Sequence, residues 1–178
     1  MLPRFRTAPV LLTLCACSAP VPASPTILTT VGLGVVQLGM TVTQAEQALG
    51  AGLEPMNPGT DAACWMTRRA DGRAGQVFYM VENGKITRID INTAASAGTP
   101  AVVKTAAGIG IGATEADVLR AYGKSTKVMP NKYDEHGRSL VVERPDAKSA
   151  LLFETSNGKV TTFRAGFHPS VDYVEGCS

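Results

Sequence analysis

Two stretches of the chain carry the same short pattern of apolar and polar positions. In Thr41 to Gly50, and again in Thr114 to Gly123, apolar residues recur at the three- and four-residue spacing of one helix face. Each stretch starts with a threonine, a good N-terminal cap, and ends with a glycine, which readily adopts the left-handed conformation of a C-terminal cap. A capping partner, Gln44 or Asp117, lies three residues after each threonine. The pattern predicts two short helices, which must pack on other elements to be stable.

A hairpin pattern follows each predicted helix. The dipeptide Asn-Gly accepts the positive φ angles of a tight hairpin turn, and it occurs at Asn83-Gly84 and at Asn157-Gly158. Residues of alternating polarity flank both turns, as in half-buried strands. The hairpin strands are expected at Val77–Val81, Lys85–Ile91, Leu151–Thr155 and Lys159–Ala165.

Further segments complete each copy. A third strand is expected at Cys64–Arg68 and at Ser139–Glu143, after loops 54–63 and 124–138, and short leading strands are expected at Gly34–Leu38 and Gly108–Ile111. The predicted fold class is α+β, with two tandem helix-plus-antiparallel-sheet repeats, each a short helix followed by a three-stranded sheet with an Asn-Gly hairpin. Repeat 1 would span residues 26–98 and repeat 2, with a C-terminal tail, residues 99–178; the small-residue segment 93–100 would link them.

Residues 1–25 have the features of an export signal and linker. Met1–Arg6 is short and positive, and the apolar run Ala8–Cys17 that follows is too short to span a bilayer. The segment Leu14–Cys17 is similar to a lipobox, which predicts lipidation of Cys17. Cleavage after Ala23 without lipidation is the alternative. We therefore expect a periplasmic lipoprotein anchored to the outer membrane, or, in the alternative, a soluble periplasmic or secreted protein.

The state of Cys64 and Cys177 depends on export. Disulfides persist in oxidising compartments, and neither cysteine has the histidine or cysteine spacing of a zinc site. A bond between them would close a long loop, which the loop-entropy model values at roughly 4 to 5 kcal/mol, and it would hold the C-terminal tail against the first copy. Two buried or free thiols are the alternative.

The charge balance argues against a nucleic-acid partner. The formal net charge is +2, but Arg4 and Arg6 belong to the predicted leader, so the rest of the chain is close to neutral. Capture of nucleic acid needs a basic face. We expect no nucleic-acid partner, and contact with a membrane through the lipid anchor alone.

The first repeated segment resembles a known family. The spacing of Gly39, Thr41, Gln44 and Gly50, between a short strand and an antiparallel sheet, resembles the helix motif of small protein A / outer-membrane lipoprotein A. Those are single-unit lipoproteins of the outer-membrane protein assembly machinery. The tandem arrangement is similar to β-lactamase-inhibitory protein, whose two halves each hold a disulfide. The ending Tyr173–Cys177 is similar to that of proteobacterial lipoproteins of unknown role, some of which are called lectins. These resemblances imply a fold and an anchor, but no functional residue carries over.

The residues that could carry catalysis match no complete motif. His136, with Asp134 and Ser139 nearby in sequence, would allow an unrecognised hydrolase with a catalytic triad. The sequence contains no Gly-x-Ser-x-Gly elbow, and Gly108–Gly112 lacks the Lys-Ser/Thr partner of a phosphate loop. We predict that the protein is not an enzyme and has no catalytic residue, metal or cofactor.

The remaining candidates are recognition residues. Lys132, Tyr133 and His136 lie in one polar loop, and Trp65 and Tyr79 lie in predicted strands. Tyrosine and tryptophan are frequent anchors of interfaces, although Trp65 and Tyr79 could equally belong to the core or to a sheet face. We expect a non-enzymatic envelope lipoprotein that acts as a protein-binding module of the inhibitor or assembly-accessory type. Carbohydrate or peptidoglycan binding is the alternative, so the partner would be an envelope protein or a cell-wall glycan.

Overall fold

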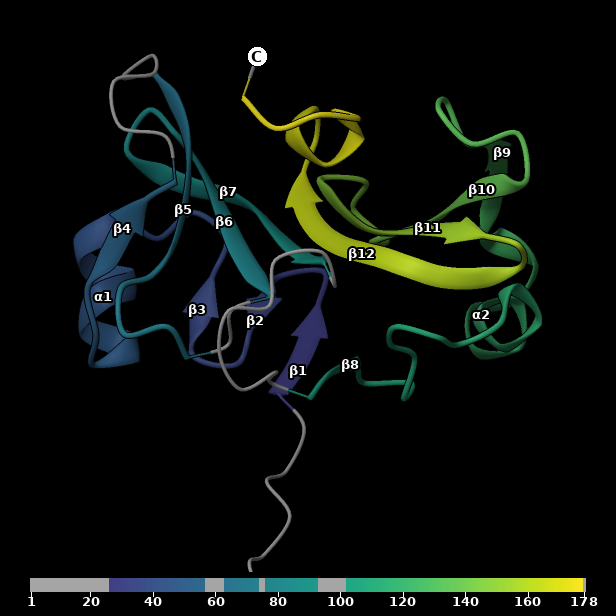
Figure 1. Ribbon diagram of the computed structural model, residues 1–178, viewed down its shortest axis with the longest axis horizontal. Coiled ribbons are helices and arrows are strands. Elements are labelled where there is room, and N and C mark those ends of the chain that lie inside the picture. The colour runs from purple at the N-terminus through teal and green to yellow at the C-terminus, as the bar shows by residue number, and fades with distance from the viewer. Residues whose placement is uncertain (1–25, 57–62, 74–75, 93–101, 178) are drawn as a thin grey trace, which may run out of the picture.

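The computed structural model describes residues 26–56, 63–73, 76–92 and 102–177. The predicted leader with Cys17 and the predicted link 93–100 lie outside them. The elements in chain order are β1 Thr26–Thr29, β2 Gly32–Leu33, β3 Val36–Gln37, α1 Val42–Leu49, β4 Leu53–Pro55, β5 Cys64–Arg69, β6 Val77–Glu82, β7 Lys85–Asn92, β8 Val103–Thr105, α2 Glu115–Tyr122, η2 Gly123–Ser125, β9 Lys127–Pro130, β10 Gly137–Glu143, β11 Ser149–Ser156, β12 Lys159–Phe167 and η3 Ser170–Asp172. The fold is α+β, and most of it is sheet (Figure 1).

Both helices begin at the predicted capping boxes. Thr41 Oγ1 accepts a hydrogen bond from the Gln44 backbone N–H at 3.2 Å, and Gln44 Oε1 accepts one from the Thr41 backbone N–H at 2.9 Å. Thr114 forms the same box with Asp117. The predicted left-handed glycine cap at the C-terminus is confirmed for α1, where Gly50 has φ 62° and ψ 29°. Gly123 has φ 76° but ψ −164°, because the chain continues there into the 3-10 turn η2.

The main sheet is continuous and antiparallel. It has eight strands in the order β4-β5-β6-β7-β12-β11-β10-β9, and β7 pairs with β12 at its centre. The expectation of two three-stranded sheets was therefore wrong in extent. Each half contributes four strands. β9 lies within the expected loop 124–138, β4 overlaps the start of the expected loop 54–63, and they pair with β10 and β5.

The leading segments form a second, smaller sheet in the order β3-β2-β1-β8. The strand expected at Gly34–Leu38 is limited to β3, and the strand expected at Gly108–Ile111 is absent from that segment and lies earlier, at β8. β1 pairs with β8 in parallel, with Thr26 opposite Val103. A parallel partner from a distant segment decides where β8 lies, so local pattern could not predict it, whereas β3 pairs with its sequence neighbour β2.

Both Asn-Gly hairpins are present and share one irregularity. Asn83 and Asn157 have φ angles of 50° and 48°, as the predicted turns require. In each hairpin the register shifts by one residue shortly after the turn, which leaves Thr87 and Thr161 as extra residues. The bulge changes the face on which the following side chains lie.

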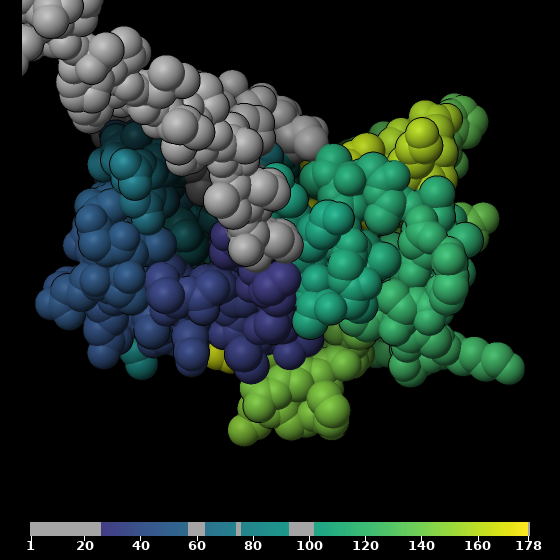
Figure 2. Space-filling view, turned by 90° about the horizontal axis from the view of Figure 1, so that it is seen from below, coloured from purple at the N-terminus to yellow at the C-terminus, as the bar shows by residue number. Residues whose placement is uncertain are grey.

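The main sheet lies between two different layers. α1, α2 and the small sheet cover one face, here called the helix face, and Figure 2 shows the β1–β3 segment between the first half of the chain and the segment that begins at β8. The large core lies on the helix face and includes Phe153, Phe163 and Ile89. On the other face a smaller cluster forms around Val171 of η3. The C-terminal strap, residues 168–177, crosses this second face (Figure 1).

The two helix starts have matching surroundings. Gly39 N donates to Ile86 O at 2.7 Å, and Ile86 N donates to Met40 O at 2.9 Å. In the other half, Gly112 N donates to Val160 O and Val160 N donates to Ala113 O, both at 2.8 Å. Each helix start is thus hydrogen-bonded to the strand that follows its own Asn-Gly turn.

Candidate functional site

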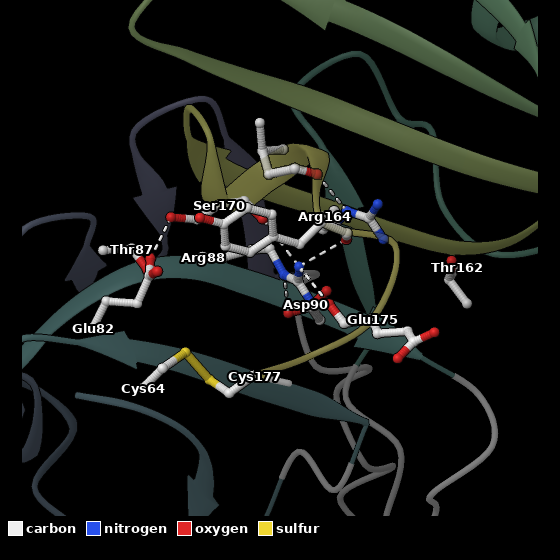
Figure 3. A network of polar contacts seen from close by, with 12 residues as sticks. Cys64, Glu82, Thr87, Arg88, Asp90, Thr162, Arg164, Ser170, Glu175 and Cys177 are labelled. Carbon is white, nitrogen blue, oxygen red and sulfur yellow. Dashed lines mark hydrogen bonds and ion pairs between the residues drawn. A yellow bond between two sulfur atoms is a disulfide. The ribbon is translucent and has the colours of Figure 1, made fainter. Parts of the chain in front are cut away.

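A buried arginine of β7 holds the C-terminal strap. Arg88 is 3% exposed. Its Nη1 donates to the carbonyl oxygens of Ser170 and Tyr173, each at 3.0 Å, and of Glu175 at 3.2 Å. Its Nε donates to Asp90 Oδ2 at 2.9 Å (Figure 3). One guanidinium therefore binds three backbone carbonyls of a segment that lies 82 to 87 residues further along the chain.

A second arginine repeats this arrangement on β12. Arg164 is 6% exposed; its Nε donates to Val171 O at 2.8 Å and its Nη1 donates to Glu154 Oε1 at 3.1 Å. Thr162 donates to the other oxygen of Glu154 at 2.9 Å. Burial lowers the pKa of Arg164, while the charge of Glu154 opposes that shift. Buried charges are tolerated when each has an opposite charge and hydrogen bonds, as both arginines have here.

The disulfide fixes the end of the strap. The predicted bond between Cys64 and Cys177 is present, with a Cα–Cα distance of 5.5 Å. At the strap's beginning, Ser170 Oγ donates to Glu82 Oε2, which also accepts from Thr87 Oγ1 at 2.6 Å (Figure 3). The strap is therefore attached to β5, β6, β7 and β12, which belong to both halves of the chain.

His168, the first residue of the strap, makes two contacts with carboxylates. Its Nδ1 lies 2.6 Å from Asp172 Oδ2 and its Nε2 lies 2.9 Å from Glu143 Oε2. The hydrogen bond with Asp172 raises the pKa of His168, and partial burial opposes that rise. Protonated His168 can donate to both carboxylates at once.

The arginine network holds the C-terminal strap against the main sheet. A hollow of 340 Å³ lies beside it. Apolar side chains such as Met56 and Met66 line it, together with five charged residues: Arg88, Asp90, Glu154, Arg164 and Glu175. The two guanidinium charges are balanced by Asp90 and Glu154. Sequence reasoning missed this network. The signal was present in the charged residues that alternate with isoleucines in Lys85–Ile91.

Three predicted binding residues lie together in the turn between β9 and β10. Tyr133 is 64% exposed, and its hydroxyl donates to Glu175 Oε1 of the strap at 2.5 Å. Lys132 Nζ lies 5.1 Å from the centroid of the Tyr133 ring. His136 is exposed, and its Nε2 lies 3.6 Å from Glu135 Oε1. This turn is accessible to solvent, and the hydrogen bond between Tyr133 and Glu175 connects it to the strap. The partner of His136 is Glu135, in the same turn.

The other two predicted binding residues lie elsewhere. Tyr79 is 2% exposed and packs in the core on the helix face; burial raises its pKa to about 12. Trp65 is partly buried against the same core. Tyr79 is therefore a core residue, as the alternative interpretation had it, because so buried a ring cannot stack on a ligand from solvent.

The edge strand β9 continues the exposed turn. All four of its residues are exposed, among them Val128 at 42% and Met129 at 46%. An open hollow of 320 Å³ beside them is also lined by Pro130, Glu135 and Arg138. β9 and the turn 131–136, here called the β9 surface, form the apolar and polar surface that best fits recognition of a partner.

Comparisons with known proteins give no family. No protein-family profile matches the chain, and no curated protein sequence matches it. The chain is distantly similar to a DUF4309 family protein, YjgB, from Bacillus subtilis subsp. subtilis strain 168, with 14% identity, a TM-score of 0.46, and coverage of 80% of this chain and 87% of that one. It is also distantly similar to an extracellular protein containing an SCP domain from Bacillus anthracis strain Ames, with 11% identity, a TM-score of 0.48 and coverage of 88% of this chain. The chain spans 50% of the length of that second protein.

None of the helices in the described residues is long and apolar enough to cross a membrane. No group of three or more histidine, cysteine or acidic residues in that part of the chain is arranged to hold a metal ion.

Proposed function

We propose that this protein is a non-enzymatic binding module of the bacterial cell envelope, which recognises another protein through the β9 surface. The observation that carries the proposal is the exposure of Val128, Met129 and Tyr133 at one end of an otherwise well-packed sheet. Exposed apolar and aromatic side chains grouped with polar ones are typical of interaction sites. An inhibitor or an assembly accessory would use such a surface without any chemistry.

The envelope location is part of the same proposal. The Cys64–Cys177 disulfide supports it, because such bonds persist in oxidising compartments such as the periplasm. We propose lipidation at Cys17 and anchoring to the outer membrane, with cleavage after Ala23 and a soluble protein as the alternative. Mass spectrometry of the mature protein, compared with a Cys17→Ala variant, distinguishes the two.

We also propose that the two halves of the chain descend from one duplicated unit. The matching capping boxes, the equal bulges at Thr87 and Thr161, and the equal contacts of Gly39 and Gly112 support this. The repeats would then be residues 26–98 and 99–178, joined through the β7–β12 and β1–β8 pairs. The binding role would belong to the second repeat, because all four residues of β9 are exposed, whereas only Pro55 of β4, the corresponding edge strand, is exposed.

In vivo photocrosslinking tests the binding role. A photoreactive amino acid replaces Tyr133, and in a matched control it replaces Arg73, whose side chain is 83% exposed. We expect a defined envelope protein to be crosslinked from position 133 and not from position 73. A partner crosslinked equally from both positions, or from neither, would contradict the proposal.

Glycan binding is a second candidate because Tyr133 is exposed. A sugar ring would stack on the Tyr133 face that Lys132 does not cover. Binding to peptidoglycan fragments that is lost in Tyr133→Ala and kept in Lys132→Ala would support it. Absence of binding to any fragment would leave the protein partner as the better proposal.

A further inference from the structure

A hollow of 510 Å³ lies where α1, the small sheet and the main sheet meet (Figure 1). Small-molecule sites have volumes of roughly 300–1,000 Å³. The small sheet and its β2–β3 turn contribute apolar side chains, among them Leu33, Val35 and Val103. β5 and the turn after it contribute two cations, Arg69 and Arg73, and none of the described residues that line the hollow is acidic. The hollow thus combines an apolar wall with a cationic one.

One buried residue of the lining has a hydroxyl without a partner. Tyr79 lines the hollow but is only 2% exposed, and its hydroxyl makes no hydrogen bond with the described part of the chain. An unpaired buried hydroxyl costs about 1–3 kcal/mol, so most such groups in native proteins are paired. Burial raises the pKa of Tyr79 to about 12, and the nearby charge of Arg69 opposes that rise. The hydroxyl is therefore a protonated donor beside a guanidinium, and the described residues offer it no acceptor.

The ion pairs around the hollow leave one positive charge unbalanced. Arg69 contacts Asp71 twice, from Nε to Oδ1 at 3.0 Å and from Nη2 to Oδ2 at 2.6 Å. The one ion pair of Arg73 with the described residues is to the same carboxylate, and its Nε lies 4.0 Å from Oδ2. Two guanidinium groups thus share one carboxylate, and the Arg73 side chain is 83% exposed at the rim. A ligand with one negative charge would balance this set.

The second half of the chain fills the equivalent space with two aromatic rings. Counted from the Asn-Gly turns, Phe153 occupies the place of Tyr79, and counted from the capping threonines, Tyr122 occupies the place of Leu49. The rings of Tyr122 and Phe153 pack with their centroids 5.7 Å apart. In the first half, Leu49 is smaller than tyrosine and lines the hollow. A smaller side chain therefore leaves space beside a ring that has gained a hydroxyl.

The neighbouring strand differs between the halves in the same sense. Two residues beyond the partner of Tyr79, β5 has Arg69. Two residues beyond the partner of Phe153, β10 has Val142, which packs against the core. The first half thus has a hydroxyl, a smaller side chain and a guanidinium where the second half has an apolar cluster. These three differences change the character of the space from packed and apolar to open and polar on one side.

We propose that this hollow binds a carboxylate with an apolar body, such as a medium-chain fatty acid, at a site separate from the β9 surface. The hydrocarbon lies against Leu33, Val35 and Val103, of which Val35 is 58% exposed without a ligand. The Tyr79 hydroxyl donates to a carboxylate oxygen, and Arg73 supplies the balancing charge at the rim. A phosphate monoester fits less well, because it carries about 1.5 to 2 negative charges at neutral pH.

Probes with one tail and different head groups test the charge preference. Octanoate is anionic, octylammonium is cationic and 1-octanol is neutral, while propionate has the carboxylate with hardly any tail. Each is titrated by calorimetry into the full chain with Cys17→Ala, so that no acyl chain on Cys17 competes for the hollow. Octanoate should bind about tenfold more tightly than 1-octanol or octylammonium, the effect of one charged hydrogen bond. Propionate should show no binding at the same concentrations.

Substitutions assign the binding to this hollow. Tyr79→Phe removes only the hydroxyl, and Arg73→Gln removes only the charge; each should weaken octanoate about tenfold. Their matched controls, Tyr173→Phe and Arg120→Gln, lie outside the lining and should bind octanoate like the native protein. Leu49→Tyr should fill the hollow and abolish binding of both octanoate and 1-octanol.

Urea unfolding and circular dichroism report whether each variant is folded. Tyr79→Phe should be at least as stable as the native protein, because its hydroxyl has no partner to lose in the described residues. If Tyr79→Phe is unfolded, Arg73→Gln decides, since its exposed side chain can change without disturbing the core.

Three results would overturn the inference. The first is that octanoate does not bind, and the second is that octylammonium or 1-octanol binds as tightly as octanoate. The third is octanoate binding that folded Tyr79→Phe and Arg73→Gln leave unchanged, which would place the ligand elsewhere on the protein. None of these results bears on crosslinking from position 133, so the protein-binding function is tested independently.

Discussion

Replacing Arg88 with methionine tests whether the strap is held mainly by this one side chain. Methionine keeps the apolar stem but cannot donate to the carbonyls of Ser170, Tyr173 and Glu175. It also leaves the Asp90 carboxylate, whose side chain is 16% exposed, without its ion pair. The variant therefore combines loss of charged hydrogen bonds with a partly buried, unpaired charge.

The expected loss follows from the burial of the pair. Breaking a buried ion pair by removing one partner lowers the free energy of unfolding by about 3–5 kcal/mol. Domains are stable by about 5–15 kcal/mol in total, so Arg88→Met should remove a large part of the stability. The matched control is Arg68→Met. Arg68 Nε lies 3.0 Å from Glu54 Oε1, close to the 2.9 Å of the Arg88–Asp90 pair, but both side chains are more than 40% exposed. That control should lose about 0–1 kcal/mol.

Urea unfolding with the disulfide intact measures both variants, followed by circular dichroism and by the fluorescence of Trp65, the single tryptophan. Adding Asp90→Asn to Arg88→Met should recover part of the loss, because it removes the orphaned charge. If Arg88→Met and Arg68→Met lose the same amount, or if Asp90→Asn makes Arg88→Met less stable still, the strap is not held as described.

Two further predictions concern the ends of the strap. The double substitution Cys64→Ser/Cys177→Ser should lower the free energy of unfolding by about 2–4 kcal/mol, and equal urea midpoints with and without the bond would refute it. For His168, the pKa is raised in the folded state by Asp172 and Glu143, so its stabilising effect is complete below its ordinary pKa near 6.5 and is lost as the pH rises through the raised value. The stability difference between the native protein and His168→Gln should therefore shrink from pH 5.5 to pH 8.5 in urea unfolding; a difference that is constant or grows would contradict the assignment.

Elements with local signals were predictable from the sequence. The helices begin at Thr41 and Thr114 because a hydroxyl three residues before a backbone N–H can cap it without help from the rest of the chain. The two hairpins turn at Asn-Gly because these residues tolerate positive φ angles. The disulfide followed from the residue count and the expected compartment.

Features that depend on distant partners were not predictable. β4 and β9 are strands because β5 and β10 provide the edges on which they pair, and β8 exists because β1 lies beside it. Tyr79 was a candidate for recognition until the sheet placed its ring in the core.

The sequence by itself determined where helices start, where hairpins turn and which cysteines were available to pair, because each depends on contacts within a few residues. Only the tertiary structure decided the burial of Arg88 and Arg164 and the openness of the β9 edge. Two bulges set the face on which the arginines lie, and a strap more than eighty residues away from Arg88 covers them. The order of the strands leaves β9 without an outer neighbour in the described residues. Hydrophobic periodicity records which side chains avoid water, but it does not record which chain segment will cover a charge or leave a strand uncovered.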